Sequence, residues 1–187
     1  HGGAEFTKAS VHHIKNERIE NMIMGDGGKA FYDSGFYNIG VRPTREGLGV
    51  GGKDPFGFPL SESRLARDFG DKAFKKLIGV DPNEKPKAKD RVAADGAFKT
   101  PGLRNIELTA PYFHNGGQRT RRGVVDFYNR GGDFHENNIA DLDPDVENLG
   151  LSNADKDALV AFLKSLTDER VRRRCAPFDH PELYIPN

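Results

Sequence analysis

The chain has 187 residues, which is enough for one domain with a real core, and its 28 basic and 28 acidic side chains balance. This balance excludes a general electrostatic affinity for nucleic acid or for an anionic membrane. Cys175 is the only cysteine, so internal disulfides are excluded, and no apolar run has the length of a membrane span or the layout of a signal peptide. Low hydrophobic content (36%), 22 glycines and 11 prolines predict a loop-rich domain. Such a domain often needs a metal or cofactor to stabilise its core.

The first third of the chain predicts little regular structure. The polar stretch "SVHHIKNERIENMIM" (10–24) is compatible with a short helix or an irregular arm. Residues 25–59 contain ten glycines interleaved with Phe and Tyr, which is typical of successive turns. No Gly-Lys-Ser/Thr follows them, so an aromatic-pinned surface loop is favoured over a phosphate loop.

Helix signals appear further along. A helix is expected over 61–79, with Ser61 or Ser63 as its cap and Gly70 interrupting the pattern. The charged, proline-bearing segment 81–96 predicts an exposed loop. Thr120 caps a second expected helix over 121–130, which ends at Gly131-Gly132.

The clearest helix signal is "SNADKDALVAFLKSLTD" (152–168). Ser152 and Asp155 have the spacing of a capping box. One apolar stripe follows, formed by Leu159, Phe162, Leu163 and Leu166. The elements together predict a mostly α, loop-rich fold with few or no short strands.

Candidate metal chemistry is weak in the residues themselves. No two of the six histidines have the i, i+4 spacing of a helical zinc site. Asp141, Asp143 and Asp145 alternate as in a calcium loop, but the central Gly and terminal Glu are missing, so a solvated acidic loop is favoured. Taken alone, His114 and Tyr128 are best explained as structural residues.

Several longer segments carry a resemblance. "FKTPGLRNIELTAPYFHNGG", "GVVDFYNRGG", "LDPDVENLGLSNADKDALVAFLKSLTD" and "HGGAEFT" together resemble the C-terminal haem domain of the bacterial di-haem cytochrome c peroxidase/MauG family, in a larger variant carrying "GFYNIGVRPTREGLGVGGKDPFGFPL". The resemblance covers nearly the whole chain. It implies that residues 1–187 form one c-type cytochrome-like domain of a longer protein.

The resemblance implies two iron ligands. His1 matches the His of a Cys-x-x-Cys-His motif that attaches haem c, and the two cysteines, absent from these residues, are expected just before it. Counting from Thr109, the distal position falls on Tyr128, where the peroxidases of the family have Met and MauG has Tyr. A phenolate favours Fe(III) and higher oxidation states, whereas a thioether favours Fe(II).

Further roles follow from the same resemblance. Thr109 and Pro111 match positions whose backbone carbonyls bind a calcium ion (Ca²⁺). His114 matches a His near the haem, and Arg104 is expected to pair with a propionate. Arg121 and Arg122 oppose the dipole of the helix they begin, so they are expected to face a carboxylate, a propionate or solvent.

The family implies a haem-dependent, peroxidase-type oxidoreductase located in the periplasm. This domain would pass electrons to a peroxide-reacting haem in the N-terminal haem domain, so the peroxide site is expected outside these residues. A small redox protein or protein substrate would donate the electrons, and homodimerisation is left open. Two alternatives remain at this point: an electron-transfer module without peroxidase activity, and a haem-free scaffold domain.

Overall fold

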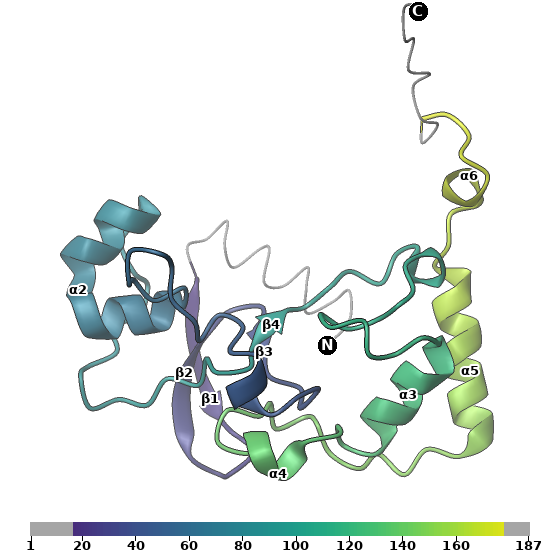
Figure 1. The fold of residues 1–187 in the computed structure, drawn as a ribbon, viewed down its shortest axis with the longest axis horizontal. Coiled ribbons are helices and arrows are strands. Elements are labelled where there is room, and N and C mark those ends of the chain that lie inside the picture. The colour runs from purple at the N-terminus through teal and green to yellow at the C-terminus, as the bar shows by residue number, and fades with distance from the viewer. Residues whose placement is uncertain (1–16, 178–187) are drawn as a thin grey trace, which may run out of the picture. The chain divides into compact units, whose positions relative to one another are not determined.

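The computed structural model describes residues 17–177, which divide into two compact units (Figure 1). Unit 1 comprises residues 17–101 and 127–150, and unit 2 comprises residues 102–126 and 151–177. His1, His12, His13 and His180 lie outside the described residues. No helix in residues 17–177 is both long and apolar enough to cross a membrane.

The first element of unit 1 is a β-hairpin, where the sequence favoured a short helix or an irregular arm. Strand β1 (Ile19–Ile23) pairs antiparallel with β2 (Lys29–Asp33). The "MGDGG" turn between them is closed by Met24 N–H donating to Gly28 O and by Gly28 N–H donating to the Asp26 carboxylate, both at 2.9 Å. An Asp-Gly pair between two short strands is a hairpin signal, and it outweighs the weak helical pattern of residues 10–24.

Helix α2 (Glu62–Ile78) confirms the expected helix, its cap and its interruption. Ser61 accepts a hydrogen bond from Arg64 N–H, and Gly70 leaves helical geometry at φ 75°, which kinks the helix. Leu65, Ala66 and Phe74 pack with Ile19 of β1 into a buried core, whereas Phe69 is 47% exposed.

Asp33, the last residue of β2, completes the start of α2. Its buried carboxylate accepts hydrogen bonds from the Ser61 hydroxyl (3.1 Å) and from the backbone N–H groups of Glu62 (3.1 Å) and Ser63 (2.7 Å). Burial raises the pKa of Asp33, although these donors and the helix dipole favour its charge. The hairpin and the helix are thereby tied together.

The segment 81–96 is a loop, as expected, but its second half is not exposed. Val92, Ala93 and Ala94 are buried. Phe31 N–H donates to Arg91 O and Ala93 N–H donates to Phe31 O, so this segment pairs with the free edge of β2. Expecting full exposure was wrong because the apolar "VAA" run belongs to the core.

The remaining elements of unit 1 are short. Strand β3 (Phe36–Tyr37) pairs antiparallel with β4 (Phe98–Lys99). The 3-10 turn η1 (Thr44–Glu46) and helix α4 (His135–Asn138) lie within long loops. With only four short strands described, the expectation of a mostly α, loop-rich fold is confirmed.

Unit 2 contains the two other predicted helices. Helix α3 (Arg121–Asn129) begins after Thr120, whose hydroxyl accepts from Gly123 N–H at 3.0 Å, and its last turn belongs to unit 1. Helix α5 (Asn153–Ser165) has the predicted capping box in full, and η2 (Ile106–Leu108) packs against it. Helix α6 (Glu169–Arg172) follows. Leu159 and Phe162 of the predicted apolar stripe are 41% and 55% exposed.

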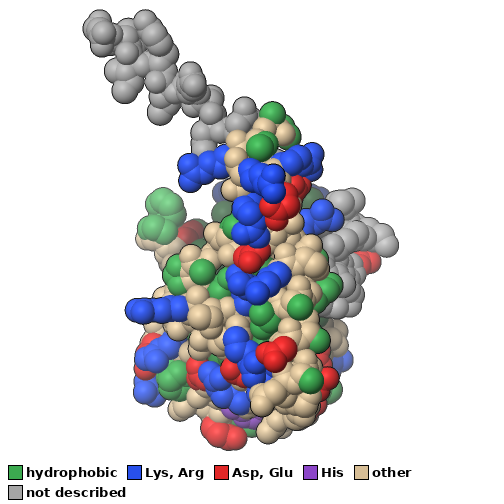
Figure 2. All heavy atoms as spheres, turned by 90° about the vertical axis from the view of Figure 1, so that its right-hand side faces the viewer, with side chains coloured by type: hydrophobic (Ala, Val, Ile, Leu, Met, Phe, Trp, Pro, Cys, Tyr) green, Lys and Arg blue, Asp and Glu red, His purple; other side chains and the backbone are tan. Residues whose placement is uncertain are grey.

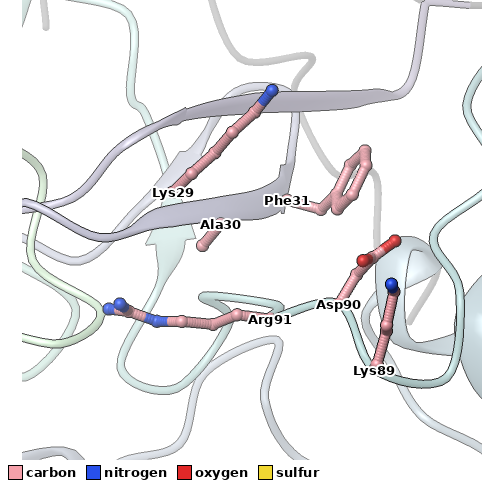
Figure 3. A pocket seen from close by; sticks show the side chains of 6 residues that line it. All are labelled: Lys29, Ala30, Phe31, Lys89, Asp90 and Arg91. Carbon is pink, nitrogen blue, oxygen red and sulfur yellow. The ribbon is translucent and has the colours of Figure 1, made fainter.

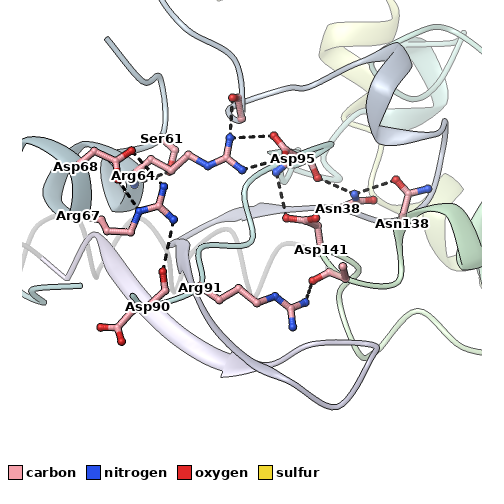
Figure 4. A network of polar contacts seen from close by, with 12 residues as sticks. Asn38, Ser61, Arg64, Arg67, Asp68, Asp90, Arg91, Asp95, Asn138 and Asp141 are labelled. Carbon is pink, nitrogen blue, oxygen red and sulfur yellow. Dashed lines mark hydrogen bonds and ion pairs between the residues drawn. The ribbon is translucent and has the colours of Figure 1, made fainter. Parts of the chain in front are cut away.

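A polar network joins the loops of unit 1 (Figure 4). Arg64 of α2 forms a two-pronged ion pair with Asp95, at 2.9 Å for each nitrogen–oxygen contact, and also donates to Gly51 O. The backbone of Asp95 accepts from the Asn38 amide and donates to the Asp141 carboxylate at 3.3 Å. Gly51 is required here, because a Cβ would lie 2.1 Å from an Asp95 carboxylate oxygen.

The capping box of α5 generates a stability prediction. Replacing Ser152 with Ala removes the acceptor for Asp155 N–H (3.2 Å), so we expect the free energy of unfolding to fall by about 1 kcal/mol in urea denaturation. Ser165→Ala is the matched control, since it removes an exposed hydroxyl from the last turn of the same helix. Equal losses in the two variants would contradict the assignment of the cap.

Asp141 generates a pH prediction. Burial and the nearby Asp95 raise the pKa of Asp141 above its unfolded value, so the ionised carboxylate destabilises the fold at neutral pH. This penalty is relieved as the pH falls through the folded-state pKa. We therefore expect Asp141→Asn, whose amide oxygen can still accept from Asp95 N–H, to be more stable than the parent at neutral pH, with the difference shrinking in acid.

Urea midpoints measured at neutral pH and near about pH 4 test this expectation. Asp145→Asn, in the exposed part of the same loop, is the matched control because it removes one charge from that loop. A loss of stability in Asp141→Asn at neutral pH would show that the charge is favourable.

Candidate functional site

The residues singled out by the family resemblance are divided between the two units. Tyr128 lies in unit 1, and His1 lies outside the described residues. The other four lie in unit 2: Arg104, Thr109, Pro111 and His114. The structure therefore gives the local geometry of five of the six, each within its own unit.

Tyr128 occupies the last turn of α3, beside the fully buried Phe127. The two rings meet edge to face, with centroids 5.4 Å apart. Among the described residues, no group forms a hydrogen bond with the Tyr128 hydroxyl. Tyr128 is partly buried, and its hydroxyl is not sealed off from solvent, so the hydroxyl is open to a ligand that the described residues do not supply.

The electrostatic surroundings of Tyr128 oppose its ionisation. Burial, and to a smaller extent the charge of Asp143, raise the pKa of Tyr128 to about 12. The phenol is therefore neutral at physiological pH unless a positive charge lies beside it. A ferric ion would supply that charge, because a bound metal ion inverts the local pKa balance. The Tyr128 hydroxyl, which bonds to no described residue and is not sealed off from solvent, is open to such an ion.

Asp143 was not predicted to matter. The sequence favoured a solvated acidic loop over residues 133–150, but Asp143 is 2% exposed and its carboxylate accepts from Asp145 N–H at 2.9 Å. Leu142 and Val146 on either side are also buried. Leu142 and Val146 were the available signal that part of this loop is buried, but they do not mark Asp143 itself. In residues 17–177 no three His, Cys, Asp or Glu side chains gather as a metal cluster.

The segment from Leu103 to Gln118 in unit 2 is irregular yet closely held. Asn105 N–H donates to Leu166 O, and the Asn105 side-chain oxygen accepts from Asp168 N–H at 2.8 Å. The buried Tyr112 donates its hydroxyl to Ile106 O at 3.0 Å and pairs through its backbone with Gln118. These contacts replace regular secondary structure and fix the loop to the end of α5.

Thr109 and Pro111 lie on this segment with exposed side chains. Neither of their carbonyl oxygens accepts a hydrogen bond from a described residue, so both remain available as hard oxygen ligands for a cation. The His114 residue as a whole is also exposed. Its imidazole is still partly desolvated, and this lowers the pKa of His114. The neutral imidazole is therefore favoured.

The two arginines that begin α3 both face carboxylates. Arg121 lies 3.6 Å from Glu107, and Arg122 forms ion pairs with Asp157 (2.6 Å) and Asp126 (3.4 Å). This confirms the first of the three surroundings expected for them. Neighbouring acids thus offset the unfavourable placement of cations at a helix N-terminus.

Unit 2 is more basic than the chain as a whole. Its described residues hold ten Lys and Arg against six Asp and Glu, whereas the whole chain is balanced. Figure 2, which faces the side of α5 and α6, shows the blue Lys and Arg side chains spread along these elements. The exposed Arg104 belongs to this set. Such a surface favours anionic ligands and acidic partners.

A surface pocket of about 460 Å³ opens in unit 1 between β2 and the loop at residues 89–91 (Figure 3). Ala30 and Phe31 supply its apolar wall, and Lys29 and Lys89 flank it. Arg91 is engaged with Asp26 at 2.8 Å. None of the residues that the family resemblance singles out lines this pocket, so we do not assign it a role in the candidate site.

Tyr128 generates a titration prediction. Because the charge of Asp143 contributes to the raised pKa, we expect Asp143→Asn to lower the Tyr128 pKa from about 12 toward its ordinary value. Asn retains a side-chain oxygen for Asp145 N–H. Alkaline absorbance titration measures the shift, with Tyr128→Phe identifying which transition belongs to Tyr128. An unchanged transition in Asp143→Asn would leave burial as the only cause.

No family model matches the chain. Three curated proteins show what it is similar to. "Cytochrome-c peroxidase IdrP2" of Denitromonas iodatirespirans is 50% identical over 72 residues, which cover 38% of this chain and 17% of that protein. "Methylamine utilization protein MauG" of Paracoccus denitrificans is 37% identical over 95 residues, covering 42% and 24%. "Cytochrome c551 peroxidase" of Nitrosomonas europaea is 36% identical over 76 residues, covering 39% and 18%.

The matched stretch spans about a fifth of the length of these relatives. Identity of one third to one half over more than 70 residues, repeated across several proteins of both names, reflects common descent. In this matched part the chain is therefore a homologue of the cytochrome c peroxidases and MauG, and the family resemblance predicted from the sequence is confirmed.

Proposed function

We propose that this chain is the C-terminal haem domain of a peroxidase-type oxidoreductase and passes electrons to a peroxide-reacting haem in a partner domain. The observation that carries the proposal is the 50% identity, over 72 residues, to a protein named a cytochrome-c peroxidase. The bound haem c would supply one-electron redox chemistry at its iron. Reduction of one hydrogen peroxide to two waters consumes two electrons and two protons. Because a haem iron exchanges one electron at a time, this domain would deliver its electrons singly.

His1 and Tyr128 are the residues that would hold the haem iron. The support for Tyr128 is its hydroxyl, which forms no hydrogen bond with a described residue, on a partly buried ring that packs against Phe127. A phenolate in this place stabilises the ferric state and lowers the reduction potential relative to a thioether. The domain is then suited to MauG-like oxidative chemistry more than to holding electrons at high potential.

Unit 2 supplies the proposed outer contacts. Arg104 is exposed and positively charged, and its guanidinium would bind a haem propionate through paired N–H groups. His114, favoured as the neutral imidazole, would lie near the haem as a hydrogen-bonding residue. The carbonyl oxygens of Thr109 and Pro111 would contribute to a calcium site that other ligands complete.

The electron donor that fits unit 2 is a small redox protein or protein substrate with an acidic surface, since the described residues of this unit hold ten cations and six anions. A periplasmic location accords with haem c attachment in the family. Homodimerisation stays a prediction. The acidic donor should react more slowly as ionic strength rises, because salt screens the attraction.

The natural protein, with whatever sequence flanks these residues in its gene, provides the test. We expect a pyridine haemochrome spectrum of haem c and a change in the haem absorbance on adding peroxide. Replacing Tyr128 with Met should raise the reduction potential of one haem, because a thioether favours Fe(II). Tyr112→Phe is the matched control, since Tyr112 is a buried tyrosine that bonds to Ile106 O instead.

Each negative result selects a different alternative. Haem that does not respond to peroxide, with no turnover of a reduced donor, would leave an electron-transfer module. Absence of haem would leave a scaffold domain. An unchanged potential in Tyr128→Met would remove Tyr128 from the iron while leaving the enzyme proposal in place.

A further inference from the structure

Residues 71–89 of unit 1, which form the second half of α2 and most of the loop after it, carry charge of the opposite sign to the rest of that unit. They contain six lysines and three acidic residues, whereas the other described residues of unit 1 contain ten Lys and Arg against sixteen Asp and Glu. The charge balance of the whole chain conceals this separation. A surface cluster of one sign attracts ligands of the other sign.

Two ion pairs hold the loop against α2. Lys75 contacts Asp81 at 2.8 Å, and Lys85 contacts Asp71. Both prolines of the loop are buried, which anchors it further. The end of the helix and the loop therefore present one surface, on which two of the three acids are already engaged by two of the six lysines.

The four other lysines form no ion pair with a described residue. All of them are exposed: Lys72, Lys76, Lys87 and Lys89. Lys72 and Lys76 are one helical turn apart, on the face opposite Phe74, which is fully buried in the core. The core thus fixes the helix with these two lysines toward solvent. Glu84 is the one remaining acid of the segment, so positive charge is in surplus.

Exposed aliphatic side chains are interleaved with these lysines. Leu77, in the last turn of α2, is 48% exposed, and Val80, directly after the Gly79 that ends the helix, is 38% exposed. We call Leu77, Val80 and the six lysines of residues 71–89 the lysine face. Ammonium groups combined with exposed aliphatic side chains are typical of surfaces that bind the interface of a membrane.

The type of cation favours lipid over an acidic protein as the ligand of this face. All six cations are Lys, whereas eight of the ten cations described in unit 2 are Arg. Arg is enriched at protein–protein interfaces, where its planar fork binds carboxylates in pairs, and Lys is depleted there. Lys is a point charge on a long flexible stem, which suits headgroup phosphates that have no fixed position.

We propose that the lysine face docks unit 1 on the surface of a membrane that contains anionic lipids, as a peripheral contact. The four free ammonium groups lie at the headgroup phosphates, and Leu77 and Val80 enter the boundary between headgroups and acyl chains. The contact requires neither haem nor a partner domain, so it goes beyond the proposed function and does not depend on it.

Vesicle sedimentation with the natural protein tests the inference. We expect the protein to bind vesicles made of phosphatidylglycerol and phosphatidylcholine in equal amounts, and to bind vesicles of phosphatidylcholine alone far more weakly. The binding should weaken as ionic strength rises, because salt screens the attraction between the lysines and the headgroups.

Two double variants locate the contact. Replacing both Lys72 and Lys76 with Gln should lower the vesicle partition coefficient by roughly 25-fold, since each cation near an anionic surface contributes about fivefold. Replacing both Arg119 and Lys164 with Gln is the matched control, because it removes the same charge from exposed positions of unit 2. The control should bind vesicles as the parent does.

Three results would overturn the inference: no binding to the anionic vesicles, equal binding to both kinds of vesicle, and equal losses in the two double variants. Capture of the protein by poly-glutamate but not by the anionic vesicles would also overturn it, and would assign the lysine face to an acidic protein. Haem content, measured on the same samples, reports on the proposed function alone.

Discussion

The ion pair between Arg64 and Asp95 is the contact on which the loops of unit 1 depend. Regular structure cannot hold these loops, since the strands are short and the glycines are many. Instead one guanidinium binds the Asp95 carboxylate and Gly51 O, while the Asp95 backbone binds Asn38 and Asp141. Five chain segments meet around this half-buried pair. Removing either partner would leave the other charge without its ion-pair partner, which costs more than the pair itself contributes.

The two units use their charged side chains differently. In unit 1 the side chains of Arg64 and Asp33 bind backbone groups of neighbouring segments. In unit 2, Glu107 receives Arg121, Arg172 and Thr167, but the cations outnumber the acids. The charged side chains named in unit 1 therefore stabilise its fold. In unit 2 the surplus of cations is available for an anionic ligand or an acidic protein.

Signals carried by neighbouring residues were readable from the sequence. Ser61, Gly70, Thr120 and the Ser152–Asp155 box act over a few residues, and each was found where expected. The hairpin of β1 and β2 had a local signal in its Asp26-Gly27 turn, which the weak helical pattern obscured. The burial of Val92 and Asp143 was not readable, because it depends on contacts between segments far apart in the chain. Arg64 and Asp95, for example, are 31 residues apart, and no local pattern links them.

The candidate site divides in the same way. Tyr128 was located by counting within a family motif, whereas its raised pKa comes from burial and from Asp143, which composition assigned to solvent. The calcium and propionate roles of the loop at 103–118 rest on motif positions alone. What the structure adds is that the carbonyl oxygens of Thr109 and Pro111 are not used by any described residue.

The placement of Asp33 has a consequence for the order in which unit 1 folds. The first turn of α2 receives its acceptor from a residue 28 to 30 positions earlier, so this turn is completed only when the loop between Asp33 and the helix is closed. Closing a loop of this length costs entropy before the helix returns any stabilisation. The hairpin and the helix should therefore form as one cooperative step, and hydrogen exchange should give the amides of Ser63 and of the hairpin the same opening free energy.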